Sequence, residues 1–224
     1  MGIFKKIFKK EYKKLKLLLL AMFLLNLGSV GYILISLKSA FSVNSSVFVW
    51  VNTIEKNELY FYNLLFTMSL TGIVLGLMQF LPEFDKKRYR ISCHLPVSET
   101  GMIFSMFFSG MIFLSVIAFF SYVLLFLLGS AYFPEEIYGA AYPVYIKGYY
   151  RMIAWYLMMS VVVLEPNKFR KAFLIVVLMP MSFIFSIAGG YNTLNGQLIP
   201  YLIMLICFIP MILSPAYRFR KGDF

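Results

Sequence analysis

Charge is scarce in this chain of 224 residues, of which only 14% are charged and 61% are hydrophobic. A soluble domain is about one quarter charged, so this composition excludes an ordinary soluble protein. The mean hydropathy of +0.79 points the same way. A helix that crosses a bilayer needs roughly 20 mostly apolar residues. Six such helices fit into the chain with short connections, and they leave no room for a separate soluble domain.

Histidine and cysteine are also scarce. His94 is the one histidine, and Cys93 and Cys207 lie far apart. This supply does not give the ligand spacing of an ordinary metal site or a disulfide framework, and we expect both thiols to be reduced. A Ser/His/carboxylate triad that includes Ser92 and His94 stays open, although a single histidine in a basic segment is far more often a surface residue.

Two motifs that would supply energy are missing. No glycine-rich loop ending in Lys-Ser or Lys-Thr occurs, so the chain has no evident way to bind ATP by itself. No pair of carboxylates lies within an apolar run, as a proton-coupled pump would need. We therefore expect neither enzymatic activity nor a bound cofactor in this chain.

Positive charge is in excess, with 21 Lys and Arg residues against 10 Asp and Glu residues. These residues flank the apolar runs, which favours contact with anionic lipid headgroups over binding of nucleic acid. Seventeen of the 21 fall in the first 16 residues, in 82–100, in 165–171 and in the C-terminal tail. Because short cytoplasmic loops are enriched in Lys and Arg, this distribution predicts that both termini are cytoplasmic, in a plasma (inner) membrane.

Residues 1–16 predict an amphipathic helix that lies in the plane of the membrane interface. Apolar side chains recur there at helical spacing, and lysines fill the positions between them. The apolar positions include Phe4, Ile7, Phe8 and Tyr12. A lysine-rich anchor without a fixed structure is the alternative.

Residues 17–224 predict one all-α transmembrane domain of six helices. The expected spans are residues 17–37, 59–81, 101–129, 149–164, 172–190 and 198–214. Small residues permit close helix approach, and we expect this of Gly28 and Gly31 in the first span and of Gly72 and Gly76 in the second.

Polar residues between and within these spans predict an outer loop, the position of Arg151 and a role for Asn26. Residues 130–148 read as an outer loop because they contain two prolines, two glutamates and a lysine. Arg151 is expected to snorkel to the interface, with a polar cavity as the alternative. Asn26 is expected to bond to a neighbouring helix or to line a path.

The segment 82–100 is the longest strongly charged stretch between two spans. We predict that it is a cytoplasmic loop which a soluble partner grips, and that Leu95-Pro96-Val97-Ser98 then starts the next element. The charged residues expected to make this contact are Glu83, Asp85, Lys86, Lys87, Arg88 and Arg90.

This charged segment and Leu-Pro element, with an amphipathic N-terminal helix and six spans, resemble the ABC-2 type permeases of ATP-binding cassette transporters. The resemblance implies that residues 1–16 are the elbow helix and that 82–100 is a coupling loop docking a separate ATPase subunit. It implies a second permease subunit, in a homo- or heterodimer, and ATP-Mg bound by the ATPase. The expected function is export of a substrate by ATP-driven alternating access.

A non-transporting membrane scaffold subunit, or an integral membrane enzyme that acts on lipid, is the competing interpretation. The same topology would serve it, and the basic loops would then be ordinary topology signals.

Overall fold

The computed structural model describes residues 2–55, 59–85, 99–165 and 167–184, and positions 199, 202, 203, 205, 206 and 208. Within these residues the regular structure is entirely helical, which confirms the predicted all-α class. The helices are α1 (Gly2–Val43), α2 (Ser46–Glu55), α3 (Tyr62–Asp85), α5 (Glu99–Tyr132), α6 (Glu135–Leu164) and α7 (Lys168–Ile184). Most of the predicted sixth span and the whole C-terminal tail lie outside the described residues.

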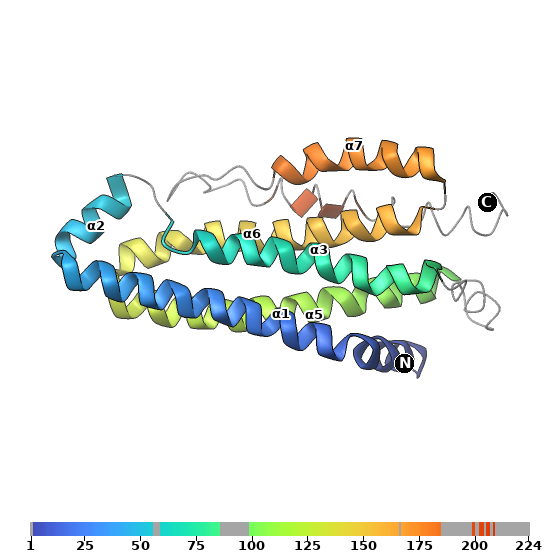
Figure 1. Cartoon of the computed structure of the whole chain (residues 1–224), viewed down its shortest axis with the longest axis horizontal. Helices are drawn as coiled ribbons and strands as arrows, with labels where there is room; N and C mark the ends of the chain where they lie inside the picture. Colours follow the sequence, from blue (N-terminus) through green and yellow to red (C-terminus); the bar gives the residue numbers. More distant parts are fainter. Residues whose placement is uncertain are drawn as a thin grey trace.

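α1, α3, α5 and α6 lie side by side along one axis and form an elongated bundle (Figure 1). α2 lies at one end of it, and α7 folds back beside α6 from the other end. At what we call the basic end, α1 begins, α3 ends, α5 begins and α6 turns into α7 (Figure 1). At the far end, α1 leads into α2 and α5 leads into α6.

The two ends differ in charge. Exposed cationic side chains at the basic end are Lys5, Lys6, Lys9, Lys10, Lys13, Lys16, Lys168 and Arg170. The far end has the exposed carboxylates of Glu55, Glu135 and Glu136, with Lys38. The sequence has four basic segments, namely 1–16, 82–100, 165–171 and the C-terminal tail. The described parts of the first three lie at this one end of the bundle.

Among the described residues, three helical segments are long and apolar enough to cross a membrane, namely Phe4–Val43, Tyr62–Pro82 and Gly101–Tyr132. Large apolar side chains cover their outer faces, such as Leu17 and Phe119, which are 83% and 63% exposed. Soluble proteins rarely expose contiguous apolar patches of this kind. The chain is therefore a helical membrane protein.

α6 is the most enclosed of the helices, and it packs most extensively on α3. Two glycines on α3 make this possible. A Cβ atom at Gly76 would lie only 2.8 Å from the carbonyl oxygen of Tyr156, and one at Gly72 would lie still closer to that of Met152. The predicted close approach at these two positions is confirmed.

At Gly28 and Gly31 the same prediction is wrong for the described residues. A Cβ atom at either position would meet nothing within 4 Å. Both glycines are exposed on the outer side of α1, where no helix of the described bundle covers them.

The outer loop predicted over 130–148 is also wrong. α5 continues to Tyr132, and α6 begins at Glu135 after Pro134, whose extended backbone (φ −66°, ψ 161°) precedes the first turn. Glu135 and Glu136 occupy that turn, where negative charge stabilises the amino end of a helix. The polar composition that reads as a loop is the start of a helix.

Arg151 contacts a neighbouring helix. It is half-buried in α6, and its Nη2 donates to the main-chain carbonyl of Leu65 in α3. Lys147, one turn earlier, is buried as well, with 4% of its surface exposed. The position of Arg151 relative to the membrane interface stays a prediction.

Candidate functional site

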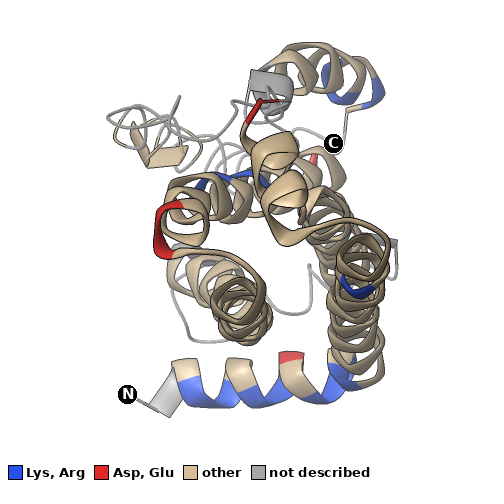
Figure 2. Cartoon of the chain, turned by 90° about the vertical axis from the view of Figure 1, so that its left-hand side faces the viewer, with Lys and Arg blue, Asp and Glu red and all other residues tan. Residues whose placement is uncertain are grey.

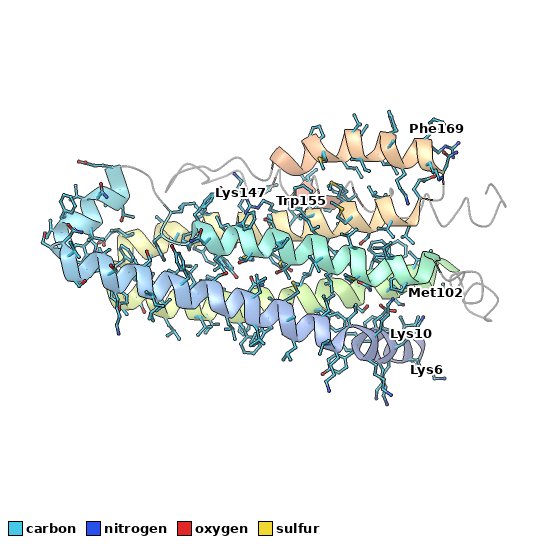
Figure 3. The ribbon with its side chains drawn as sticks, in the orientation of Figure 1. Lys6, Lys10, Met102, Lys147, Trp155 and Phe169 are labelled. Carbon is cyan, nitrogen blue, oxygen red and sulfur yellow. The ribbon has the colours of Figure 1, made fainter. Side chains whose placement is uncertain are left out.

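The first turns of α1 lie across the bundle axis at the basic end, with their lysines along the edge away from the other helices (Figure 2). Lys6 and Lys10 belong to this edge (Figure 3). The segment is continuous with the long apolar part of α1. The boundary predicted at residue 16 is therefore not an interruption of the helix, and the described segment is helical, as the amphipathic pattern predicts.

The apolar side of this segment packs on α5 through aromatic rings. The ring centroids of Phe4 and Phe108 are 5.8 Å apart, and those of Phe8 and Phe113 are 5.1 Å apart. Tyr12 also reaches Phe113, at 6.4 Å. These separations are within the favourable range for aromatic pairs. Ile7 is half-buried beside them, so all four predicted residues of the interfacial helix lie in described structure.

Two charged residues of the segment turn toward the bundle. Glu11 is fully buried, and the ammonium of Lys14 lies 3.7 Å from its carboxylate. The same Lys14 Nζ donates a hydrogen bond of 2.5 Å to the main-chain carbonyl of Gln79, in α3. The N-terminal segment is thus attached to α3 as well as to α5.

Gln79 extends this attachment to two more helices. Its Nε2 donates to the carbonyl of Met106 in α5 at 2.8 Å, and its Oε1 accepts from the Tyr156 hydroxyl of α6 at 2.9 Å. The side chains of Gln79 and Tyr156 are fully buried. We call Lys14, Gln79, Met106 and Tyr156 the Gln79 junction. It joins α1, α3, α5 and α6 at one level of the bundle.

Apolar rings and one glycine enclose the junction. The ring of Phe80 lies 4.7 Å from that of Phe107, and the Tyr156 ring lies 6.1 Å from Phe107. A Cβ atom at Gly110 would lie within 2.6 Å of Gln79 Oε1 and closer still to the Tyr156 hydroxyl. Hydrogen bonds are electrostatically stronger in such a low-dielectric environment, and leaving a group unpaired there is costly.

The predicted docking residues follow the junction along the chain. Glu83 and Asp85 belong to the last turn of α3, which continues through Pro82 and so ends four residues after the predicted span limit at residue 81. Lys86, Lys87, Arg88 and Arg90 lie outside the described residues. Gln79 precedes Asp85 by six residues, about 9 Å of helix.

α5 begins on the other side of the charged segment, at Glu99, and Met106 follows after seven residues, about 10 Å of helix. The junction is therefore about two turns from both helix ends that flank the segment 82–100.

The sequence analysis missed Glu11, Lys14, Gln79 and Tyr156 as a group. Two signals could have found part of it. Glu11 is the one acid among the first 16 residues, and it lies on the apolar stripe, four positions after Ile7. Gln79 is the one polar residue in the stretch 72–81. A buried polar group of this kind requires partners on other helices.

A second polar contact joins α1 to α3 nearer the middle of the bundle. Asn26 Nδ2 donates to Thr71 Oγ1 at 2.8 Å, and both residues are fully buried. Of the two roles expected for Asn26, the bond to a neighbouring helix is the one that the structure shows.

An apolar cavity of about 620 Å³ lies beside the junction. Phe4, Phe108 and Leu157 line it from α1, α5 and α6, and Leu205 lines it from the part of the chain beyond α7. Phe107 both lines this cavity and contacts the Tyr156 ring. The cavity and the junction therefore share a wall.

Among the described residues, no group of three His, Cys, Asp or Glu side chains could hold a metal ion. Comparison with protein-family models, with curated proteins and with solved structures finds no match to this chain. The functional argument therefore depends on the residues and their geometry.

Proposed function

We propose that this chain is the membrane-spanning subunit of an ABC transporter, a permease of the ABC-2 type driven by a separate ATPase subunit. The Gln79 junction is the observation that carries the proposal. It attaches the N-terminal segment to α3, α5 and α6 about two turns from the ends of α3 and α5. A force applied to the segment 82–100 would therefore act on four helices together.

The proposed topology has six spans with both termini in the cytoplasm. The charge distribution supports it, because basic residues gather at the end where α1 begins and α6 turns into α7. Cytoplasmic loops are enriched in this way. In this orientation the first turns of α1 lie in the plane of the inner interface with their lysines toward the headgroups, as an elbow helix would.

The proposed mechanism is differential stabilisation of two conformations. ATP-Mg binds the partner ATPase and closes it, and the segment 82–100 carries that motion to α3 and α5 through their ends. A ligand or partner shifts such an equilibrium only by its difference in affinity for the two states. The rigid attachment at Gln79 makes α1 and α6 follow. A second permease subunit completes the translocation path.

The proposed cargo is apolar or amphiphilic, and the direction is export. The cavity beside the junction supports this class, because its lining is almost wholly hydrocarbon and aromatic. Its position against Phe107, which contacts Tyr156, would make occupation of the cavity sensitive to the same helix movement.

Copurification tests the proposal. The tagged chain is purified in a mild detergent from its native cells, and the proteins that remain bound are identified by mass spectrometry. A stoichiometric subunit with a phosphate-binding loop supports the permease. Recovery of the chain without any nucleotide-binding subunit contradicts it and favours the scaffold or lipid-enzyme alternative.

Charge-changing variants test whether the ATPase subunit docks on the segment 82–100. Glu83→Gln and Arg88→Ala should release the ATPase subunit and abolish coupled ATP hydrolysis, while the chain still inserts. Glu55→Gln and Lys38→Ala make the same kinds of change at the far end and should do neither. Equal effects at both ends would refute the docking site.

A further inference from the structure

A second cavity, of about 290 Å³, lies at the far end between α5 and α6. Five of its lining residues are tyrosines, namely Tyr60, Tyr122, Tyr138, Tyr142 and Tyr145. None of the described residues that line it is a lysine or an arginine. Its distance along the bundle from the Gln79 junction makes it a separate feature, and ligand binding there is independent of the permease proposal.

The rings of this cavity stand at steep angles to one another. Tyr122 is the central ring, 5.1 Å from Tyr145 and 5.7 Å from Tyr142, the latter pair with planes at 64°. Phe126 and Tyr138 meet edge to face at 5.5 Å. Rings that cross at such angles cannot all stack on one another. These five rings line the cavity, so they border one common space.

The rings are held in place. The Tyr145 hydroxyl donates to the carbonyl of Ala118 in α5, and the ring of Tyr60 stacks on Phe133 at 4.8 Å. A Cβ atom at Gly129 would meet both Tyr60 and Tyr138 at 3.0 Å, so the backbone of α5 lies directly against them. The cavity is preorganised.

Charges of both signs lie near the cavity along α6. The buried Lys147 follows Tyr145 by two residues, a spacing at which side chains on a helix do not face each other. Glu135 is exposed in the first turn, three and four residues before Tyr138 and Gly139, which line the cavity. Residues at this spacing share one face of a helix. A carboxylate at the rim and neutral aromatic walls attract a cation and repel an anion.

We propose that this cavity binds a methylated ammonium group, as choline carries. Aromatic side chains recognise quaternary ammonium through the negative potential of the ring face, most strongly where water is excluded. Small-molecule pockets hold roughly 300 to 1,000 Å³, so a cavity of 290 Å³ admits a compact headgroup and not a large cargo. The group is either that of a free solute or that of a phosphatidylcholine headgroup.

An experiment in two parts distinguishes a free solute from a phosphatidylcholine headgroup. In detergent without added lipid, binding of choline and tetramethylammonium is measured by calorimetry against 3,3-dimethylbutan-1-ol, the neutral isostere of choline. In mixed micelles with equal phosphatidylcholine and phosphatidylglycerol, native mass spectrometry counts the retained lipids. Saturable binding of the free cations, or selective retention of phosphatidylcholine, supports the proposal. No preference for the cation over its isostere together with no preference for phosphatidylcholine overturns it.

Paired variants show which aromatic rings of the cavity bind the cation. Tyr122→Leu and the more exposed Tyr142→Leu should each weaken cation binding by about tenfold, whereas Tyr122→Phe and Tyr142→Phe keep the ring and change it less than about threefold. Tyr32→Leu, on the outer face of α1, is the control and should bind like the parent chain. If both leucine variants elute as folded protein and bind the cation unchanged, the site is not in this cavity.

Discussion

Gln79 is the residue through which polar contacts join four helices of the described bundle. Its side-chain amide spans the space between α5 and α6, and its main-chain carbonyl receives Lys14 from α1. A leucine of similar size could fill the same space, but the Met106 carbonyl would then keep only the Ser109 hydroxyl as a side-chain donor. The Tyr156 hydroxyl would keep only its longer contact of 3.4 Å with the Phe107 carbonyl. The cost arises from those two groups and not from lost volume.

Gln79→Leu should therefore lower the free energy of unfolding by about 1 to 3 kcal/mol. Tyr156→Phe removes a single hydroxyl and should cost about 1 kcal/mol. Both values come from unfolding of the purified chain in detergent, followed by circular dichroism. A Gln79→Leu variant as stable as the parent would show that the amide bonds are not made in the membrane protein.

Lys14 permits a matched comparison with its neighbour. Lys14→Met removes the bond to Gln79, while Lys13→Met removes the same charge from an exposed position. We expect only the first to reduce substrate-stimulated ATPase activity of the reconstituted complex, by about fivefold, which corresponds to about 1 kcal/mol of lost coupling. Lys14→Arg keeps a donor and should retain most of the activity. Equal losses in both methionine variants would assign the effect to surface charge.

At the scale of whole helices, the pairing of α3 with α6 is the main contact of the bundle, and it depends on backbone proximity. The atoms that a side chain at Gly72 would meet are the carbonyl group of Met152 and its side chain. A carbonyl group within a helix cannot rotate away as the end of a long side chain can. Overpacking there must separate the two helices.

Gly72→Ala should accordingly destabilise the chain by about 1 to 3 kcal/mol, the usual cost of inserting atoms into a packed interior. Gly28→Ala makes the same change on α1 where no atom lies within 4 Å, and it should be neutral or slightly stabilising. Thermal denaturation of the two variants in one detergent gives the comparison. A loss at Gly28 as large as that at Gly72 would mean that another surface covers α1.

The sequence predicts which segments are helical more accurately than it predicts where each helix begins and ends. Runs such as 17–37 and 101–129 are apolar throughout, so length and hydropathy are enough to identify them. α6 was predicted too short, because Pro143 and Lys147 look like loop residues when only local composition is considered. The helix packs on α3, which supplies the Leu65 carbonyl to Arg151. No local pattern contains that partner.

At the candidate site, too, local spacing predicts part of the structure, and contacts between residues distant in the sequence decide the rest. The apolar stripe of Phe4, Ile7, Phe8 and Tyr12 follows from helical spacing, whereas the meeting of Lys14 with Gln79 joins residues 65 positions apart. The charged positions from Lys86 to Arg90 lie outside the described residues, so their docking role stays a prediction.

For the molecule as a whole, the orientation is the property with the most direct test. After Cys93 and Cys207 are replaced by serine, single cysteines are introduced at Ser42 and Lys168, which are exposed at opposite ends. A membrane-impermeant maleimide should label Ser42→Cys in intact cells and Lys168→Cys only after permeabilisation. The reverse pattern would invert the proposed topology, and labelling of both in intact cells would exclude an odd number of crossings between them.

The enclosed position of α6 has a consequence for how the protein is made. Under the proposed topology, a helix that carries Lys147 and Arg151 partitions poorly into lipid by itself. Only Phe133 and Pro134 separate it from α5, so the two helices leave the ribosome as a single hairpin. α3, which holds the carbonyl that Arg151 needs, has been synthesised before either of them. We therefore expect α6 to pass from the translocon directly onto its neighbours, with the order of translation providing a partner for Arg151 before that residue meets lipid.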